Sequence, residues 1–116
     1  SCPVGWHVPS GDEYMELTDY LGANQGGKMK ECTEGSCPES DYWNSPNTDA
    51  TNESGFTALP SGYYSDEGFT HQDITGYFWS SDEDQALGQF LDAESDNLIP
   101  IPSSKSSYYS IRCLKD

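Results

Sequence analysis

Three consecutive aromatic residues, Tyr77, Phe78 and Trp79, constrain the folding of this chain more than any other stretch. They stand between Gly76 and the pair Ser80-Ser81, in a sequence that is otherwise acidic and polar. Aromatic side chains bury the largest apolar areas per residue, so this run predicts a centre of the hydrophobic core. It is too short for a helix and fits a strand covered on both faces.

The length of 116 residues predicts one domain that spans residues 1–116. Hydrophobic residues make up only 34% of the chain, so the core must rely on the 13% of aromatic residues. We expect Trp6, Phe56 and Trp79 to belong to this core. The substitution Trp79→Ala should therefore unfold the domain, whereas Asp82→Ala should change ligand binding at most.

The chain is strongly acidic, with 20 acidic against 5 basic residues and a formal net charge of -15. Phosphate backbones and anionic membrane surfaces repel such a protein, which argues against nucleic-acid partners and direct membrane insertion. No apolar run approaches the roughly 20 residues of a membrane span, and no signal peptide is recognisable. We therefore interpret the charge mainly as a solvated surface.

Four cysteines, Cys2, Cys32, Cys37 and Cys113, indicate disulfides. A bond between Cys2 and Cys113 would join the ends of the chain and contribute roughly 4–5 kcal/mol in the loop-entropy model. Cys32 and Cys37 are close enough to close a single loop. Four cysteines allow three pairings, and spacing alone does not choose among them.

Zinc bound by thiolates with His7 or His71 is the alternative use of these cysteines. Neither a Cys-x-x-Cys nor a His-x-x-x-His spacing supports a zinc site. Disulfides are therefore favoured, and they predict an oxidising compartment and an extracellular or cell-surface protein.

An early helix is predicted over about residues 10–21, after an apolar strand from Val4 to Val8. Ser10 and Glu13 have the spacing of a capping box, and Gly22 is a suitable C-terminal stop. One helical face carries the less polar residues, namely Tyr14, Leu17, Thr18 and Leu21.

The region from Ala23 to Ser54 is predicted to be one long irregular loop, rich in Gly, Asn, Ser, Thr, Asp and Pro. Loops of this length are usually functional or held by a local staple, which a Cys32–Cys37 bond would provide. We expect Trp43 to anchor the loop to the core. The tripeptide Asn52-Glu53-Ser54 matches a glycosylation sequon.

The second half of the chain is predicted to form antiparallel strands. Pro100 and Pro102 confine one of these strands to an edge or a connector, because proline cannot donate to a central ladder. One early helix, a long loop region and several strands predict an α+β fold. The expected strand segments are Gly55–Leu59, Tyr63–Tyr64, Tyr77–Trp79, Ala86–Ala93, Ile99–Pro102 and Tyr108–Leu114.

Four ordered segments resemble the Fibrobacter succinogenes major paralogous domain, a family of secreted or surface bacterial modules. The stretch His7–Ser10 with Glu13 is also similar to a helix start in formylglycine-generating enzymes. These resemblances imply a C-type lectin-like fold with an antiparallel sheet, paired terminal strands and long loops on one surface. The four segments are Cys2–Ser10, Gly55–Tyr63, Gly76–Ser81 and Ser110–Asp116.

No catalytic arrangement is recognisable, and we expect no enzymatic activity. His7 lies in the apolar opening strand, and His71 lies in a predicted turn beside Asp73. Neither is near a nucleophile motif such as Gly-x-Ser-x-Gly. The reactive cysteine pair of formylglycine-generating enzymes is not matched, since Cys113 is the only late cysteine.

Calcium is the cofactor to consider, because many C-type lectins bind sugars through it. Asp82, Glu83 and Asp84 follow the central strand, and Asp92 or Asp96 could add carboxylates. The spacing of an EF-hand loop is absent, and so are the Glu-Pro-Asn and Trp-Asn-Asp signatures. We expect no cofactor and retain calcium as the alternative.

The leading hypothesis is an extracellular ligand-binding or adhesion module for a protein or carbohydrate ligand. Tyrosine offers a large contact area with few rotors to order, as in antibody loops. One alternative is a retroelement-diversified receptor-binding protein that varies within Ser103–Ser110. The other is a structural subunit of a surface filament or layer, as part of a larger assembly. The candidate ligand-binding residues are Tyr63, Tyr64, Asp66, Phe69, Asp82, Asp84, Tyr108 and Tyr109.

Overall fold

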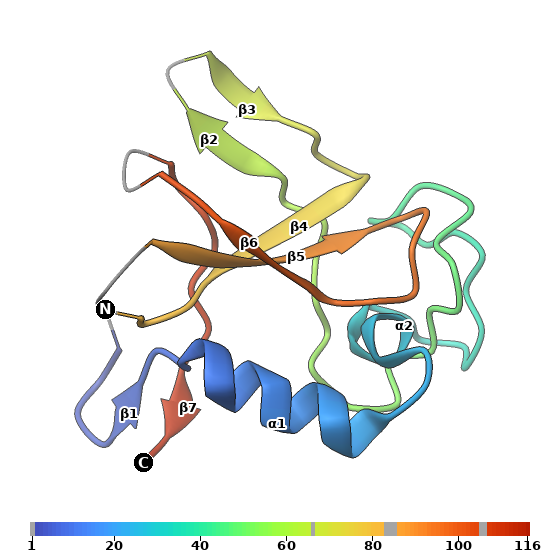
Figure 1. Ribbon diagram of the computed structural model, residues 1–116. Helices are drawn as coiled ribbons and strands as arrows, with labels where there is room; N and C mark the ends of the chain where they lie inside the picture. The colour runs from blue at the N-terminus through green and yellow to red at the C-terminus, as the bar shows by residue number, and fades with distance from the viewer. Residues whose placement is uncertain (1, 66, 83–85, 105–106) are drawn as a thin grey trace.

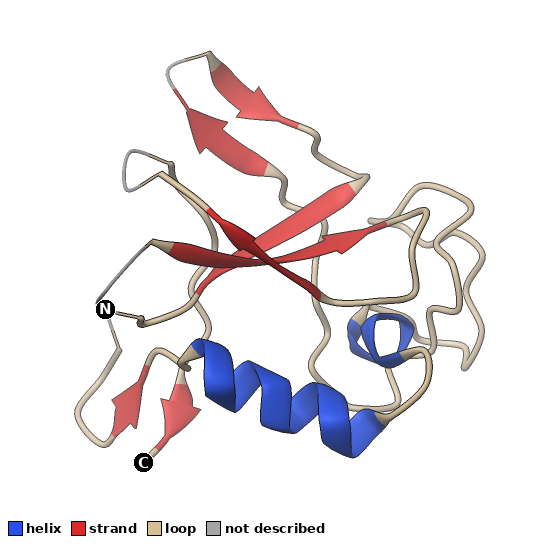
Figure 2. Cartoon of the chain, viewed as in Figure 1, coloured by secondary structure: helices blue, strands red, loops and turns tan. Residues whose placement is uncertain are grey.

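The computed structural model describes residues 2–65, 67–82, 86–104 and 107–116. Within these ranges the chain forms two helices and seven strands (Figures 1 and 2). None of the described helices has the length and apolar character needed to cross a membrane. The elements in chain order are β1 (Trp6–His7), α1 (Gly11–Leu21), α2 (Gln25–Met29), β2 (Tyr63–Ser65), β3 (Gly68–Thr70), β4 (Thr75–Trp79), β5 (Leu87–Asp92), β6 (Ile99–Pro102) and β7 (Leu114–Lys115).

The described strands form three antiparallel groups, which confirms the α+β class. The central sheet has the order β4-β5-β6, β2 pairs with β3 as a hairpin, and β1 pairs with β7. Figure 1 shows α1 on one side of the central sheet, with the hairpin projecting from the opposite side. The prediction of paired terminal strands is confirmed by the contact between β1 and β7.

Helix α1 begins as its sequence predicts. The Ser10 hydroxyl accepts a hydrogen bond from the Glu13 amide at 3.1 Å, and the Glu13 carboxylate accepts one from the Ser10 amide at 3.0 Å. This reciprocal pair satisfies two amides that a helix start leaves without partners. The helix ends at Leu21, and the Gly22 amide donates to the Thr18 carbonyl.

The core lies between α1, the long region after it and one face of the central sheet. Phe78 is buried, and its ring meets that of Phe56 edge-on at 5.5 Å between centroids. Phe56, which was predicted in the core, is partly buried and packs against the core from its edge. The buried core residues are Tyr14, Met29, Trp43, Ala58, Phe78, Leu91, Ala93 and Leu98.

Two predicted core residues lie elsewhere. Trp79 is only half-buried and is not part of the core cluster, because successive residues of a strand point to opposite faces and Phe78 takes the inner one. Trp6 is 44% exposed, since β1 has two residues and its pairing partner is the equally short β7. Both predictions that placed these tryptophans in the core are therefore wrong.

The region 23–54 is more ordered than a long irregular loop. It contains α2, and its Trp43 side chain is fully buried with the indole Nε1 donating to the Ala58 carbonyl at 2.9 Å. This burial confirms Trp43 as the anchor of the region. The disulfide Cys32–Cys37 is present as well, and so is Cys2–Cys113, so both suggested pairings are confirmed.

A buried lysine also holds this region to the rest of the domain. The Lys30 ammonium donates to the carbonyls of Thr48 and Ser95 at 3.1 and 2.7 Å, and it lies 5.5 Å from the centroid of the Trp43 ring. Burial lowers the pKa of Lys30 to about 8, against the opposite effect of three nearby aspartates. The sequence pattern does not predict this role for Lys30.

Several predicted strands are shorter than expected. Val4 is fully exposed, so the opening strand is reduced to β1. Residues 55–59 form no strand and contribute one bridge, between Ala58 and Lys30. The last predicted strand consists of isolated bridges at Tyr108 and Ser110 followed by β7, because this segment contacts two different strands in turn.

Candidate functional site

Five of the predicted ligand-binding residues meet in one surface hollow of about 330 Å³. Ser61, Gly62 and Ser110 complete its lining. We call this region the aromatic surface, and its five aromatic residues are Tyr63, Tyr64, Phe69, Tyr108 and Tyr109.

Backbone hydrogen bonds bring together the two segments that supply the aromatic surface, the β2–β3 hairpin and the segment before β7. Tyr64 in β2 stands opposite Phe69 in β3, and it also exchanges two backbone hydrogen bonds of 3.0 Å with Tyr108. The Ser110 amide donates to the Tyr77 carbonyl, and the Trp79 amide donates to the Ser110 carbonyl. The segment before β7 is thereby aligned along both β2 and β4, which positions Tyr108 and Tyr109.

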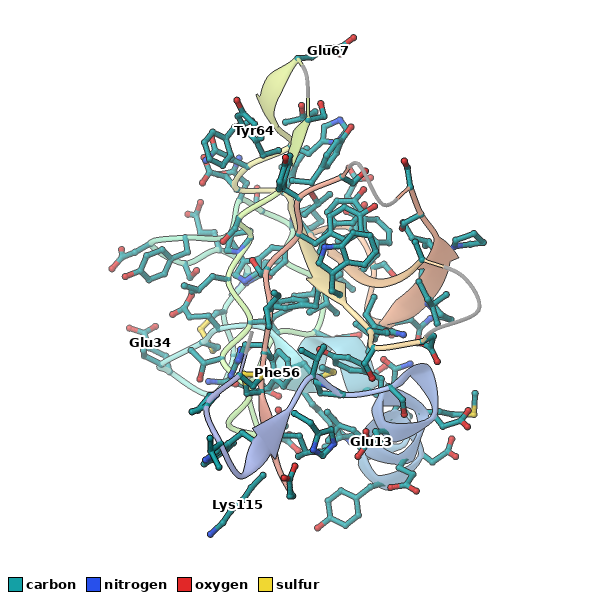
Figure 3. All side chains as sticks on the ribbon, turned by 90° about the vertical axis from the view of Figure 1, so that its left-hand side faces the viewer. Glu13, Glu34, Phe56, Tyr64, Glu67 and Lys115 are labelled. Carbon is teal, nitrogen blue, oxygen red and sulfur yellow. A yellow bond between two sulfur atoms is a disulfide. The ribbon has the colours of Figure 1, made fainter. Side chains whose placement is uncertain are left out.

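Three aromatic rings form the outer part of this surface. Tyr64, Phe69 and Tyr108 are 43%, 67% and 65% exposed, and the Tyr64 ring contacts the other two at centroid distances of 5.0 and 5.7 Å. Figure 3 shows Tyr64 near the end of the molecule that carries Glu67. Contiguous exposed aromatic groups of this kind mark interaction sites more often than isolated ones do.

A second, partly buried layer of rings supports the first. Tyr109 stacks on Tyr77 at 4.9 Å and contacts Trp79 at 4.5 Å, while Tyr63 meets Tyr77 edge-on at 5.2 Å. The Tyr109 hydroxyl donates to the Ser103 hydroxyl at 2.9 Å, which fixes its ring. These contacts hold the inner rings in place.

Tyr77 and Trp79 are the residues of this layer that sequence reasoning did not assign to the site. The alternation of side chains along β4 could have identified them, because it turns Phe78 to one face of the strand and its two neighbours to the other. Burial raises the pKa of the Tyr77 hydroxyl, and the neighbouring Tyr109 and Tyr63 add to the effect. The phenol therefore stays neutral at physiological pH.

A glycine of the adjacent strand makes room for this layer. A Cβ atom on Gly88 would lie 2.7 Å from the Tyr109 ring, closer than real side chains approach. The ring therefore packs directly against the backbone of β5.

Of the acidic residues predicted to bind the ligand, Asp82 is the one that the structure describes, and it does not line the aromatic surface. The Asp82 carboxylate accepts a hydrogen bond from the Gly11 amide at 3.1 Å and so caps the start of α1. Asp66 and Asp84 lie outside the described residues. Asp92 accepts a hydrogen bond from the Glu94 amide, and no group of three or more His, Cys, Asp or Glu in the described ranges could hold a metal ion.

His7 joins three elements at the opposite end of the domain. Its Nε2 atom lies 2.9 Å from a Glu13 carboxylate oxygen, and its Nδ1 atom lies 2.6 Å from an Asp116 oxygen. These two hydrogen bonds raise the pKa of His7 above its ordinary value of 6.5, with Glu13 contributing most. The imidazole thus links β1 to the start of α1 and to the end of the chain after β7.

This arrangement predicts a pH dependence of stability. Because the pKa of His7 is raised in the folded state, its contribution is complete below pH 6.5 and is lost as the pH rises through the folded pKa. We expect the difference in unfolding free energy between wild type and His7→Gln to shrink from pH 6 to pH 9. Urea unfolding at a series of pH values measures it, with His71→Gln as the control. A difference that stays constant across this range would contradict the prediction.

Comparisons with known proteins give one match. A family model described as the Fibrobacter succinogenes major domain matches residues 1–115. No curated protein and no solved structure matches the sequence. The C-type lectin-like fold therefore stays a prediction.

Proposed function

We propose that this chain, which belongs to the Fibrobacter succinogenes major domain family, is an extracellular module that binds a protein or glycan ligand. The aromatic surface is the proposed binding site. The observation that carries the proposal is the contact of the exposed Tyr64 ring with two other exposed rings, those of Phe69 and Tyr108. Two disulfides are consistent with an extracellular setting.

The chemistry of the aromatic surface suits such ligands. Tyrosine and phenylalanine rings present flat apolar area, and the tyrosine hydroxyls of Tyr64 and Tyr108 add hydrogen-bonding groups at its rim. The inner rings of Tyr77 and Tyr109 are already stacked, so little conformational entropy is lost when a ligand binds.

A receptor-binding protein diversified by a retroelement is the second candidate. The observation in its favour is that Tyr108 and Tyr109 both lie on the aromatic surface and both come from the segment Ser103–Ser110. Sequence changes in that segment would alter the ligand contacts directly. We propose no enzymatic role and no cofactor for either candidate.

Substitutions at the exposed rings test the proposed function. We expect Tyr64→Ala and Tyr108→Ala each to weaken ligand binding roughly tenfold, because truncation of a contact residue at the centre of an interface costs more than about 1 kcal/mol. Binding is measured on a glycan array and by pull-down of proteins from neighbouring cells, followed by titration of any ligand found. The melting temperature should change little, since both side chains are exposed.

Tyr20→Ala is the matched control, because Tyr20 is an exposed tyrosine on α1 that does not line the aromatic surface. It should bind as the wild type does. Equal ligand affinity of wild type, Tyr64→Ala and Tyr108→Ala would exclude the aromatic surface as the binding site.

A further inference from the structure

The open edge of the β2–β3 hairpin indicates a more specific class of ligand for the aromatic surface. The hairpin projects from the side of the central sheet opposite α1 (Figure 1), and among the described strands β3 pairs with β2 alone. An edge strand of this kind presents unpaired backbone groups to its surroundings. The hydrogen bonds of the neighbouring strand show which groups these are.

The backbone of Phe69 points to this open edge. The Tyr64 amide and carbonyl are both bonded to Tyr108, at 3.0 Å each, so both point away from β3. Tyr64 and Phe69 stand directly opposite each other in the hairpin. Opposite residues of an antiparallel pair either exchange both backbone hydrogen bonds or exchange neither, so the Phe69 amide and carbonyl point outward from the hairpin.

Three aromatic side chains form a row that runs across the strands to the same edge. Tyr108 is paired with Tyr64, and Tyr64 with Phe69, so the three side chains lie on one face. The ring contacts of Tyr64 with the other two, at 5.7 and 5.0 Å, agree with this arrangement. Phe69 ends the row and is 67% exposed. A residue of an added strand opposite Phe69 would continue the row with its own side chain.

The edge strand β6 differs from β3, because its outward positions cannot donate hydrogen bonds. The Ser103 amide donates to the Ala86 carbonyl, so alternation along β6 leaves Pro100 and Pro102 as the residues that face away from β5. Proline has no amide hydrogen, and such residues protect an edge from further pairing. The outward residue of β3 is Phe69, which keeps its amide hydrogen and carries no charge.

We propose that the aromatic surface binds an extended, basic peptide segment of a partner protein, which adds to the hairpin as a further strand along β3. Its backbone bonds to Phe69, and a large apolar or aromatic side chain continues the row. Its other positions favour Lys and Arg, because the chain has a formal net charge of -15 and the hairpin turn carries the exposed Glu67. The same charge disfavours a second copy of the chain as the occupant. This inference deepens the proposed function and rests on it.

Panning a phage library of random linear peptides against the full chain, in parallel with the glycan array, tests the ligand class. Enriched peptides should alternate Lys or Arg with apolar residues, and they should bind Tyr64→Ala and Tyr108→Ala at least about tenfold more weakly than wild type. Glycans that bind through the aromatic surface, with no peptide enriched, would overturn this inference and leave the proposed function standing. Peptides and glycans that bind both variants as tightly as wild type would contradict the inference and the proposed function together.

Amide hydrogen exchange of the full chain with the most enriched peptide measures the backbone pairing. At saturation, exchange of the Phe69 amide should slow at least about tenfold, whereas the Tyr64 amide, which is already bonded to Tyr108, should change less. Binding that leaves exchange at Phe69 unchanged would overturn the strand addition. Slow exchange at Phe69 that depends on protein concentration without peptide would also overturn it, by assigning the edge to a second copy.

Single N-methyl groups along the same peptide give a second measurement that needs no change in the protein. A methyl group on the amide that donates to the Phe69 carbonyl should weaken binding about 2- to 10-fold, the share of one hydrogen bond. The amides of the two neighbouring residues point away from β3, so methyl groups there should change the affinity less than about twofold. Equal losses at all three positions, or no loss at any of them, would contradict the pairing with Phe69.

Discussion

Trp43→Ala is expected to lower the free energy of unfolding by about 3–5 kcal/mol, which is a large share of the stability of a domain of this size. Trp43 is fully buried, and its indole Nε1 donates to the Ala58 carbonyl. Alanine would leave a cavity in the core and remove one of the two hydrogen bonds that the Ala58 carbonyl accepts, the other coming from the Glu31 amide. The Lys30 ammonium beside the ring would also lose its aromatic neighbour.

Chemical denaturation followed by circular dichroism measures this effect. Tyr42→Ala is the matched control, since Tyr42 is the adjacent aromatic residue and is exposed. We expect the control to change stability by less than about 0.5 kcal/mol. A Trp43→Ala variant as stable as the Tyr42→Ala variant would show that Trp43 does not anchor the region 23–54.

Phe78→Ala is expected to destabilise the domain more than Trp79→Ala does. Phe78 is buried in the core, so its truncation should cost about 3–5 kcal/mol. Trp79 is half-buried and packs on Tyr109 on the other face of β4, so its truncation should cost less and leave the domain folded. This reverses the expectation that the sequence alone favours, in which Trp79→Ala unfolds the domain.

Phe78→Ala and Trp79→Ala should also differ in their effect on ligand binding. Trp79→Ala removes the support of the Tyr109 ring and should weaken ligand binding at the aromatic surface while the domain stays folded. Denaturant midpoints and ligand titrations on the same preparations measure both effects. A Trp79→Ala variant less stable than Phe78→Ala would contradict the assignment of Phe78 to the core face.

Local patterns in the sequence predicted part of the structure well. The capping box of Ser10 and Glu13 depends on atoms a few residues apart, so its spacing alone indicates the helix start. The prolines of β6 mark an edge strand for the same local reason. The tyrosines of the aromatic surface were recognised by residue type, although their mutual contacts were not predictable.

Long-range contacts account for what the sequence did not reveal. Lys30 is buried because carbonyls of Thr48 and Ser95, from two other segments, accept its ammonium protons. Asp82 was predicted in the ligand surface, but it caps α1 because the fold places the end of β4 beside Gly11. The residue type of a polar side chain does not indicate which distant group it will contact in the folded chain.

The run Tyr77-Phe78-Trp79 shows most clearly which features the sequence determines and which the tertiary structure decides. The sequence by itself determined that these residues form a strand, since three consecutive aromatics fit a strand and not a helix. Only the tertiary structure decided which face is the core, because α1 and the region around Trp43 cover Phe78, whereas the segment before β7 brings Tyr109 to the other face. Alternation along a strand is a local property, but the layer that covers each face comes from distant parts of the chain.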